Sequence, residues 1–299
     1  IIKTNNNDID ENKNYISNYN NMTIQINKRK VDITKPKTFN NKLSVILYFQ
    51  PAYNYGIIGS GDKDKSALKS SLNYLINKNV AIVFLYPDPN DIWYAMNNGV
   101  NYNFNCINNI SNGISCWNSK DNPDLLYLQK TIDILYNDKD LNLNKMVIIG
   151  YSVGAQMTSN AIGEFPLLKT LTNKSFPNIK AAFLIAGGSQ YCYAYNNINN
   201  PPDIFLPCID KKTRLCCPRD TIEKNFMTRK LNSDKHPPTF LFQTEKDWYA
   251  DTNASNYYFH SCIKFDFKCG KFITKDNNYH GLVKNQMIIF INLILFYLT

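Results

Sequence analysis

One serine stands among residues whose types and spacing suit nucleophilic chemistry. Ser152 lies at the centre of Gly150-Tyr151-Ser152-Val153-Gly154, directly after the apolar run 146–149. A serine flanked in this way, between a buried strand and a helix, is typical of a tight turn that lifts the hydroxyl clear of a sheet. A hydroxyl becomes a nucleophile when a base removes its proton, so the pattern predicts acyl transfer through Ser152 with help from a histidine and an acid.

The choice of base is narrow, because the sequence contains three histidines: His236, His260 and His280. Where a serine turn of this kind occurs, the acid and then the histidine follow it along the chain. His236 precedes the apolar run 239–242 among prolines, and His260 falls inside an expected helix. His280 follows the last expected strand, so it is the predicted base.

Three carboxylates compete for the role of the acid that orients this histidine: Glu245, Asp247 and Asp251. They follow the run 239–242, where a loop after a strand is expected. Asp247 has the most suitable distance from the end of that strand and is the predicted acid. Asp251 is the second choice, and it would otherwise cap the following helix. The alternative for each carboxylate is a solvated loop charge.

Acyl transfer also requires two backbone N–H groups that bind the developing oxyanion. Val153, directly after the serine, is one predicted donor. The second is expected in the loop after the run 44–50; Pro51 has no N–H to give, so Ala52 is the choice and Tyr53 the next. Some aromatic side chains are candidates for lining the substrate side, although large aromatics more often pack in a core: Tyr53, Trp93 and Trp117.

The elements expected to position these residues alternate along the chain. Apolar runs predict strands at 23–27, 44–50, 81–86, 146–149, 181–186, 239–242 and 271–274. Helical spacing predicts helices at 68–76, 123–135, from 153 onwards, at 254–262 and at 287–298. Pro123 and Asp124 suit the first turn of the second helix. Strands that alternate with helices predict an α/β fold with a mostly parallel sheet covered on both faces.

The same alternation sets the expected domain organisation. Residues 1–22 are polar and predict a flexible N-terminal arm, followed by a single domain over 23–299. Within that domain, 189–235 is rich in Cys, Pro and Asn and is predicted to be an inserted cap or long loop. The final apolar run, 287–298, is shorter than the ~20 residues that span a bilayer, so it predicts a buried last helix. The remnant of a C-terminal anchor signal is the alternative.

Eight cysteines, an even number, predict a disulfide framework and hence an oxidising, extracellular location. The close pairs Cys106–Cys116 and Cys262–Cys269 are predicted to be bonded. The pairing of the other four stays open: Cys192, Cys208, Cys216 and Cys217. Reduced, buried thiols in a cytosolic protein are the alternative. Sequons, which an Asn-rich chain also produces by chance, fit a secreted glycoprotein: Asn21, Asn109, Asn173 and Asn253.

The chain carries a net charge of +9, from 33 basic and 24 acidic residues, and its Lys and Arg residues are scattered. A solvated basic surface is favoured over a nucleic-acid site, because no dense basic block is interleaved with aromatics. No Cys/His set has zinc spacing, so no metal is expected. No nucleic-acid partner and no membrane span are expected, and a monomer is the expected state.

Three segments carry a resemblance to a known family. The serine turn, Lys246-Asp247-Trp248-Tyr249-Ala250 and Tyr279-His280-Gly281 together resemble the α/β-hydrolase superfamily over roughly residues 40–299. Cys116-Trp117, followed by the segment 123–128 and the serine turn, resembles its secreted esterase branch, which includes polyhydroxybutyrate depolymerase-like and feruloyl esterase-like enzymes. The resemblance implies hydrolysis of small-molecule or polymer-linked carboxylic esters through an acyl-enzyme, without metal or organic cofactor. A lipase or serine peptidase on the same fold and a non-catalytic hydrolase-fold binding protein are the alternatives.

Overall fold

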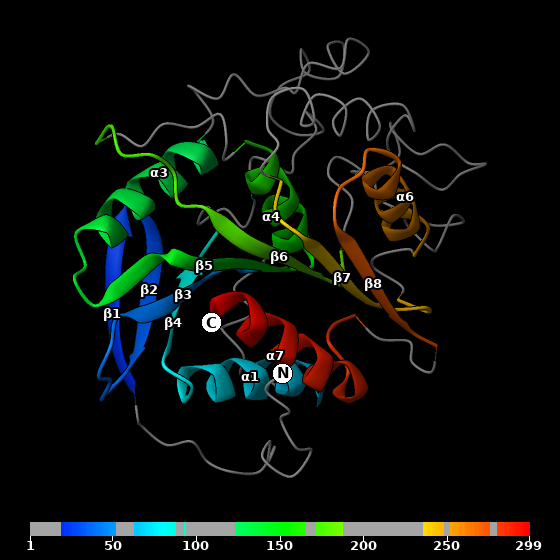
Figure 1. Ribbon diagram of the computed structural model, residues 1–299, viewed down its shortest axis with the longest axis horizontal. Helices are drawn as coiled ribbons and strands as arrows, with labels where there is room; N and C mark the ends of the chain where they lie inside the picture. The colour runs from blue at the N-terminus through cyan, green and yellow to red at the C-terminus, as the bar shows by residue number, and fades with distance from the viewer. Residues whose placement is uncertain are drawn as a thin grey trace.

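The computed structural model describes residues 19–51, 63–87, 93, 123–164, 172–187, 236–247, 252–275 and 280–299. Within these ranges one sheet of eight strands runs in the order β1-β2-β4-β3-β5-β6-β7-β8 (Figure 1). The strands are β1 (Tyr19–Ile26), β2 (Arg29–Pro36), β3 (Leu43–Phe49), β4 (Val80–Leu85), β5 (Leu141–Tyr151), β6 (Ile179–Ile185), β7 (Thr239–Thr244) and β8 (Cys269–Thr274). β2 pairs antiparallel with β1 and β4, and all other neighbours are parallel. The predicted α/β fold with a mostly parallel sheet is confirmed.

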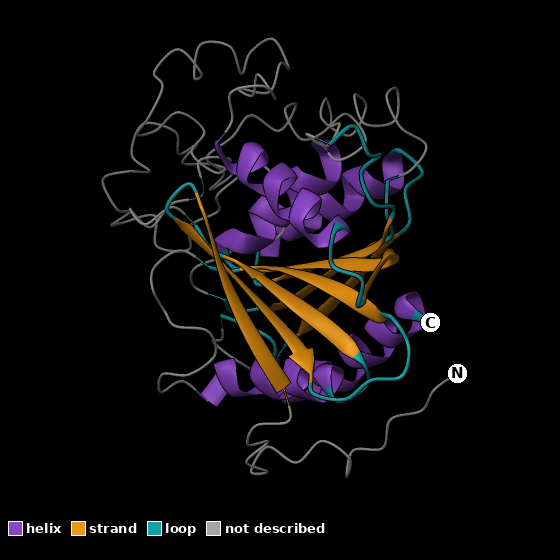
Figure 2. Ribbon diagram, turned by 90° about the vertical axis from the view of Figure 1, so that its left-hand side faces the viewer, coloured by secondary structure: helices purple, strands orange, loops and turns teal. Residues whose placement is uncertain are grey.

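Helices cover both faces of this sheet (Figure 2). One face carries α1 (Lys63–Ile76) and α7 (Lys284–Leu298), and the other carries α3 (Pro123–Tyr136), α4 (Val153–Glu164) and α6 (Thr252–Lys264). Along β3, Val45 and Leu47 pack toward α3 and α4, while Ile46 and Tyr48 pack toward α1 and α7. Both sides of such a strand are buried, which explains why β3 and β4 are nearly continuous apolar runs.

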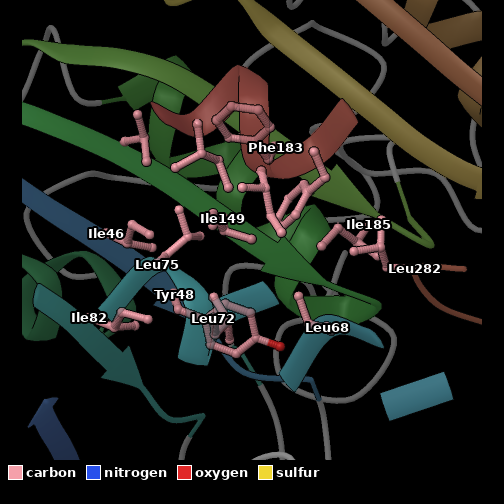
Figure 3. Close-up of a cluster of buried hydrophobic side chains, with 14 of the residues drawn as sticks. Ile46, Tyr48, Leu68, Leu72, Leu75, Ile82, Ile149, Phe183, Ile185 and Leu282 are labelled. Atoms are coloured by element: carbon pink, nitrogen blue, oxygen red, sulfur yellow. The ribbon is translucent and has the colours of Figure 1, made fainter. Parts of the chain in front are cut away.

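The face under α1 and α7 is filled by aliphatic side chains. Leucines of α1 meet isoleucines of β3, β4 and β5 (Figure 3): Leu68, Leu72 and Leu75 with Ile46, Ile82 and Ile149. α7 buries Phe290, Ile291 and Ile294 in the same cluster, so the expected buried last helix is present. Each such side chain stabilises the fold by about 1.5–3 kcal/mol through its removal from water. No helix in the described ranges combines the length and the apolarity needed to cross a membrane.

The N-terminal hairpin differs from the sequence expectation. β1 begins at Tyr19, inside the segment 1–22 that was expected to be an arm, and β2 was not predicted at all. Asn27 and Lys28 join the two strands with φ values of 49° and 69°, the left-handed pair that closes a two-residue hairpin. The sequence of β2 does not show an apolar run, because its buried residues include Arg29 and Asp32. The expected insertion at 189–235 lies outside the described residues.

Candidate active site

The candidate site lies at the carboxyl ends of the parallel strands β5, β7 and β8. Parallel strands end at one edge of their sheet, so the residues that follow them come close together even when they are distant in sequence. Ser152 follows β5, Asp247 follows β7 by three residues, and His280 lies between β8 and α7. The topology of the sheet therefore brings the three side chains to the same edge.

Ser152 is the sole residue between the end of β5 at Tyr151 and the start of α4 at Val153. Its φ of 55° lies in the left-handed region, which costs a residue with a side chain on the order of 1–3 kcal/mol. The Ser152 N–H donates to the carbonyl of Ile185 at 2.9 Å, and the Ser152 carbonyl accepts from the Ala155 N–H at 2.9 Å. Bonds to β6 and to α4 thus hold the serine in this strained conformation.

The two glycines of the turn are required by the close approach of its backbones. A Cβ at Gly150 would lie 2.1 Å from the carbonyl oxygen of Gly154. A Cβ at Gly154 would lie 2.2 Å from the carbonyl oxygen of Phe49 and 2.7 Å from that of Gln50. Both distances are far inside van der Waals contact, so a side chain at either position would push α4 away from the sheet.

The serine hydroxyl begins a continuous run of hydrogen bonds. Ser152 Oγ lies 2.8 Å from His280 Nε2, and His280 Nδ1 lies 2.9 and 3.0 Å from the two carboxyl oxygens of Asp247. Asp247 is completely buried, while His280 keeps 16% of its side chain exposed. A carboxylate accepts hydrogen bonds, so Nδ1 carries the proton and Nε2 is left to accept the proton of the serine hydroxyl. The arrangement can activate a nucleophile at the solvent boundary.

The competing candidates lie elsewhere or outside the described ranges. Glu245 is exposed, and Asp251 falls outside the described residues. His260 is exposed on α6, and the ring of His236 packs 4.5 Å from that of Phe267. Neither histidine is among the residues that the structure brings to Ser152. In the described part of the chain, no group of three or more His, Cys, Asp or Glu side chains is placed to hold a metal ion.

The expected oxyanion donors are described only in part. Val153 is the first residue of α4, where the helix itself supplies no acceptor for the N–H and the helix dipole is positive. An oxygen anion formed at Ser152 would meet this N–H next to the nucleophile. Ala52 and Tyr53, like Trp117, lie outside the described residues.

Trp93 does not line the site, in contrast to the expectation from sequence. Its side chain is 1% exposed and packs edge-on against Phe49, with ring centroids 5.3 Å apart. The indole N–H donates to the carbonyl oxygen of Gln50 at 2.8 Å. Trp93 is therefore a core residue that fixes the peptide at the end of β3, because a buried carbonyl requires a donor.

Two residues around the site had no role in the sequence-based prediction. The Tyr151 hydroxyl donates to the main-chain carbonyl of His280 at 2.7 Å. The Gln286 amide nitrogen donates to the carbonyls of Gln243 and Phe272, each at 3.0 Å, and so ties α7 to the ends of β7 and β8. The sequence signal for Gln286 is a polar residue at the start of an apolar helix, whereas Tyr151 leaves no signal beyond its place beside Ser152.

One disulfide joins described residues. Cys262 at the end of α6 is bonded to Cys269 at the start of β8, the pair that the sequence predicted. The bond closes a short turn between a helix and the edge strand of the sheet. The predicted pair Cys106–Cys116 and the four cysteines of open pairing lie outside the described residues.

No protein-family model and no curated protein matches this sequence. Solved structures resemble it in three dimensions. An acylaminoacyl peptidase from Pyrococcus horikoshii has a TM-score of 0.57 at 14% identity, covering 95% of this chain and 42% of the peptidase. A fungal esterase from Rhizomucor miehei has a TM-score of 0.52 at 14% identity, covering 94% of this chain and 82% of the esterase.

A thermostable esterase has a TM-score of 0.50 at 15% identity; the match covers 93% of this chain, which spans 60% of the length of that esterase. At such low identities these likenesses show the fold. Together with the mostly parallel sheet covered by helices, they show that the chain has the α/β-hydrolase fold.

Proposed function

We propose that this protein is a serine carboxylesterase that works through an acyl-enzyme at Ser152. The observation that carries the proposal is the run of hydrogen bonds from Ser152 through His280 to the buried Asp247. Ser152 has a left-handed backbone at the end of a buried strand, the conformation that raises a serine hydroxyl clear of a sheet. Acyl transfer through a serine needs both the hydrogen-bonded base and acid and the raised hydroxyl.

In the proposed mechanism, His280 Nε2 takes the proton of the Ser152 hydroxyl as Oγ attacks the ester carbonyl. The tetrahedral oxyanion is stabilised by the Val153 N–H and by a second donor, for which we propose Ala52. Collapse of this intermediate breaks the ester bond, and the proton on Nε2 passes to the leaving alcohol. Water then repeats the sequence on the acyl-enzyme and releases the carboxylic acid, while Asp247 holds the imidazole and stabilises its positive form.

An ester substrate is favoured over a peptide bond by the solved esterases that share the fold with coverage of most of both chains. The peptidase from Pyrococcus horikoshii is more than twice as long as the region that matches. We propose small-molecule or polymer-linked esters, aromatic esters included, as the substrate class. Turnover of acylaminoacyl p-nitroanilides without turnover of p-nitrophenyl esters would replace this proposal with a peptidase.

The experiment that tests the proposal replaces Ser152 with Ala and follows hydrolysis of p-nitrophenyl butyrate. We expect the Ser152→Ala variant to lose at least about 10⁴-fold in kcat, because removal of the nucleophile disables the whole set. Ser44→Ala is the matched control, since its hydroxyl donates to Leu298 O at 3.2 Å at the opposite end of the sheet. Equal turnover by native protein and Ser152→Ala would refute the assignment, and absence of fluorophosphonate labelling in native protein would indicate a binding protein.

We further propose that the protein is secreted and glycosylated. The disulfide between Cys262 and Cys269 supports an oxidising compartment. Two of the sequon asparagines, Asn21 and Asn173, are exposed and therefore accessible to a glycan. Enzymatic removal of N-linked glycans should increase the electrophoretic mobility of protein isolated from its natural source, and unchanged mobility would contradict the glycosylation.

A further inference from the structure

Tyr151 connects the strand that carries the nucleophile to the residue that supplies the base. Its hydroxyl donates to the main-chain carbonyl oxygen of His280 at 2.7 Å. Its ring also packs against the imidazole, with centroids 5.4 Å apart and planes inclined by 41°. Tyr151 is the last residue of β5, so it directly precedes Ser152. One rigid strand end therefore contacts both the nucleophile and the backbone of the base.

Tertiary contacts must fix the position of His280, because this residue lies in the connection between β8 and α7. Its imidazole must keep Nε2 2.8 Å from Ser152 Oγ while Nδ1 faces Asp247. On the side toward α7, Leu282 and Val283 are buried, and Gln286 ties the helix to the strand ends. The Tyr151 hydroxyl bonds to the main-chain carbonyl of His280, and such a bond fixes the peptide plane from which the side chain projects.

We propose that Tyr151 is a positioning residue that aligns His280 with Ser152 through this hydroxyl-to-carbonyl bond. The proposal rests on the proposed function. Tyr151 is not a catalytic residue, because its hydroxyl proton is directed at a main-chain oxygen and not at the reacting atoms. Its effect is geometric: when the carbonyl of His280 is held to the end of β5, nucleophile and base move together with that strand. A displacement of about 1 Å in such a contact lowers turnover by about 10²-fold.

The Tyr151→Phe variant isolates the hydroxyl, because it retains the ring that packs against the imidazole. We expect kcat for p-nitrophenyl butyrate to fall about 10- to 100-fold, with KM within about twofold of native, since substrate contacts are unchanged. Tyr136→Phe is the matched control, because the Tyr136 hydroxyl donates to the carbonyl of Ser175, away from the site. Its kcat should equal that of native protein. Equal kcat for Tyr151→Phe and native protein would overturn the proposal.

The same substitution made in the His280→Ala variant separates an alignment of His280 by Tyr151 from a general structural role of Tyr151. In His280→Ala, imidazole added to the solution can replace the missing base, and this free base is not held through the main chain of residue 280. Tyr151→Phe should then leave the imidazole-rescued rate within about twofold of that of His280→Ala alone. A rescued rate lowered as much as in the parent protein would show that Tyr151 acts on Ser152 or on the fold, and would overturn the proposal.

A spectroscopic measurement decides the matter if imidazole produces no rescued rate. The proton between His280 Nδ1 and Asp247 should give a downfield NMR signal in native protein that broadens in Tyr151→Phe and not in Tyr136→Phe. An unchanged signal in Tyr151→Phe would overturn the alignment. Failure of the proposed function would look different. Native protein would then show no ester turnover, or its turnover would not fall in the Ser152→Ala variant.

Discussion

Two of the polar networks in the described ranges are built around an aspartate with no exposed surface, and they differ in how they end. At the sheet edge, Asp247 contacts His280, which contacts Ser152 at the solvent boundary. Between β2 and α3, Asp124 is ion-paired with Arg29, and the two side chains are 0% and 3% exposed. The first network is open at one end and the second is closed on all sides.

Aromatic rings close the second network. The guanidinium of Arg29 lies 4.9 Å from the ring centroid of Tyr127 and 5.5 Å from that of Trp93. Burial raises the pKa of the Tyr127 hydroxyl, which stays neutral and donates to the carbonyl of Lys30 at 2.6 Å. The two rings and the paired carboxylate stabilise the buried cation.

The comparison shows that a buried carboxylate with a basic partner does not by itself mark a functional site. Both aspartates need their partners, because an unpaired charge in the core is costly. What distinguishes Asp247 is that its partner leads to a strained serine at the carboxyl ends of the strands. We therefore expect substitutions in the open network to change turnover, and substitutions in the closed network to change stability.

The largest expected effect is that of Asp247→Asn. Asparagine keeps the shape but cannot stabilise the imidazolium and favours the wrong imidazole tautomer, so kcat should fall about 10⁴-fold, or about 5 kcal/mol in barrier height. Steady-state kinetics with a p-nitrophenyl ester would measure it, and the urea midpoint should stay close to that of native protein. A loss below about tenfold would mean that Asp247 does not orient the base and that the two networks do not differ as described.

The next effect is expected in the closed network. Asp124→Asn leaves the Arg29 cation buried without a carboxylate and should lower the free energy of unfolding by about 3–5 kcal/mol. Its kcat per folded molecule should be unchanged, because the contact that this substitution alters is the ion pair with Arg29 between β2 and α3. Urea denaturation measures the stability, and active-site titration counts the folded molecules.

A double variant is the control for the closed network. Arg29→Met with Asp124→Leu removes both charges at similar volume and should recover most of the lost stability. A double variant as unstable as Asp124→Asn would show that shape, and not the unpaired charge, dominates at this position.

The same contrast explains what sequence could predict. Strands buried on both faces, such as β3 and β4, can be predicted because they are apolar runs in the sequence. β2 could not be predicted, because Arg29 and Asp32 occupy buried positions in it. Ser152, Asp247 and His280 could be selected together because the topology of a parallel sheet sets their order along the chain. Their catalytic roles remain predictions, although the structure brings them into contact.

Contacts to main-chain atoms could not be predicted. The acceptor for Tyr151 is the carbonyl of His280, 129 residues away, and the acceptor for Trp93 is the carbonyl of Gln50. Every residue has such a carbonyl, so no residue type at the acceptor position signals the bond. A buried tryptophan and a tryptophan that lines a substrate site therefore look the same in sequence.

The smallest expected effect concerns Trp93, which contacts Arg29 of the closed network and the Gln50 peptide beside the start of α4. Its ring faces Arg29, and its N–H holds Gln50 O, the oxygen that lies 2.7 Å from where a Cβ of Gly154 would be. Trp93→Phe keeps the ring but leaves this buried carbonyl without the indole donor, which should cost about 1–3 kcal/mol of stability. The Gln50 peptide borders the start of α4, so a shift there moves the Val153 N–H, and we expect kcat to fall about 3- to 10-fold.

Tyr127→Phe is the matched control: it removes a hydroxyl from the closed network alone and should lower stability without lowering kcat. If Trp93→Phe behaved like that control, the two networks would be independent, because the tryptophan would then stabilise the core without supporting the site.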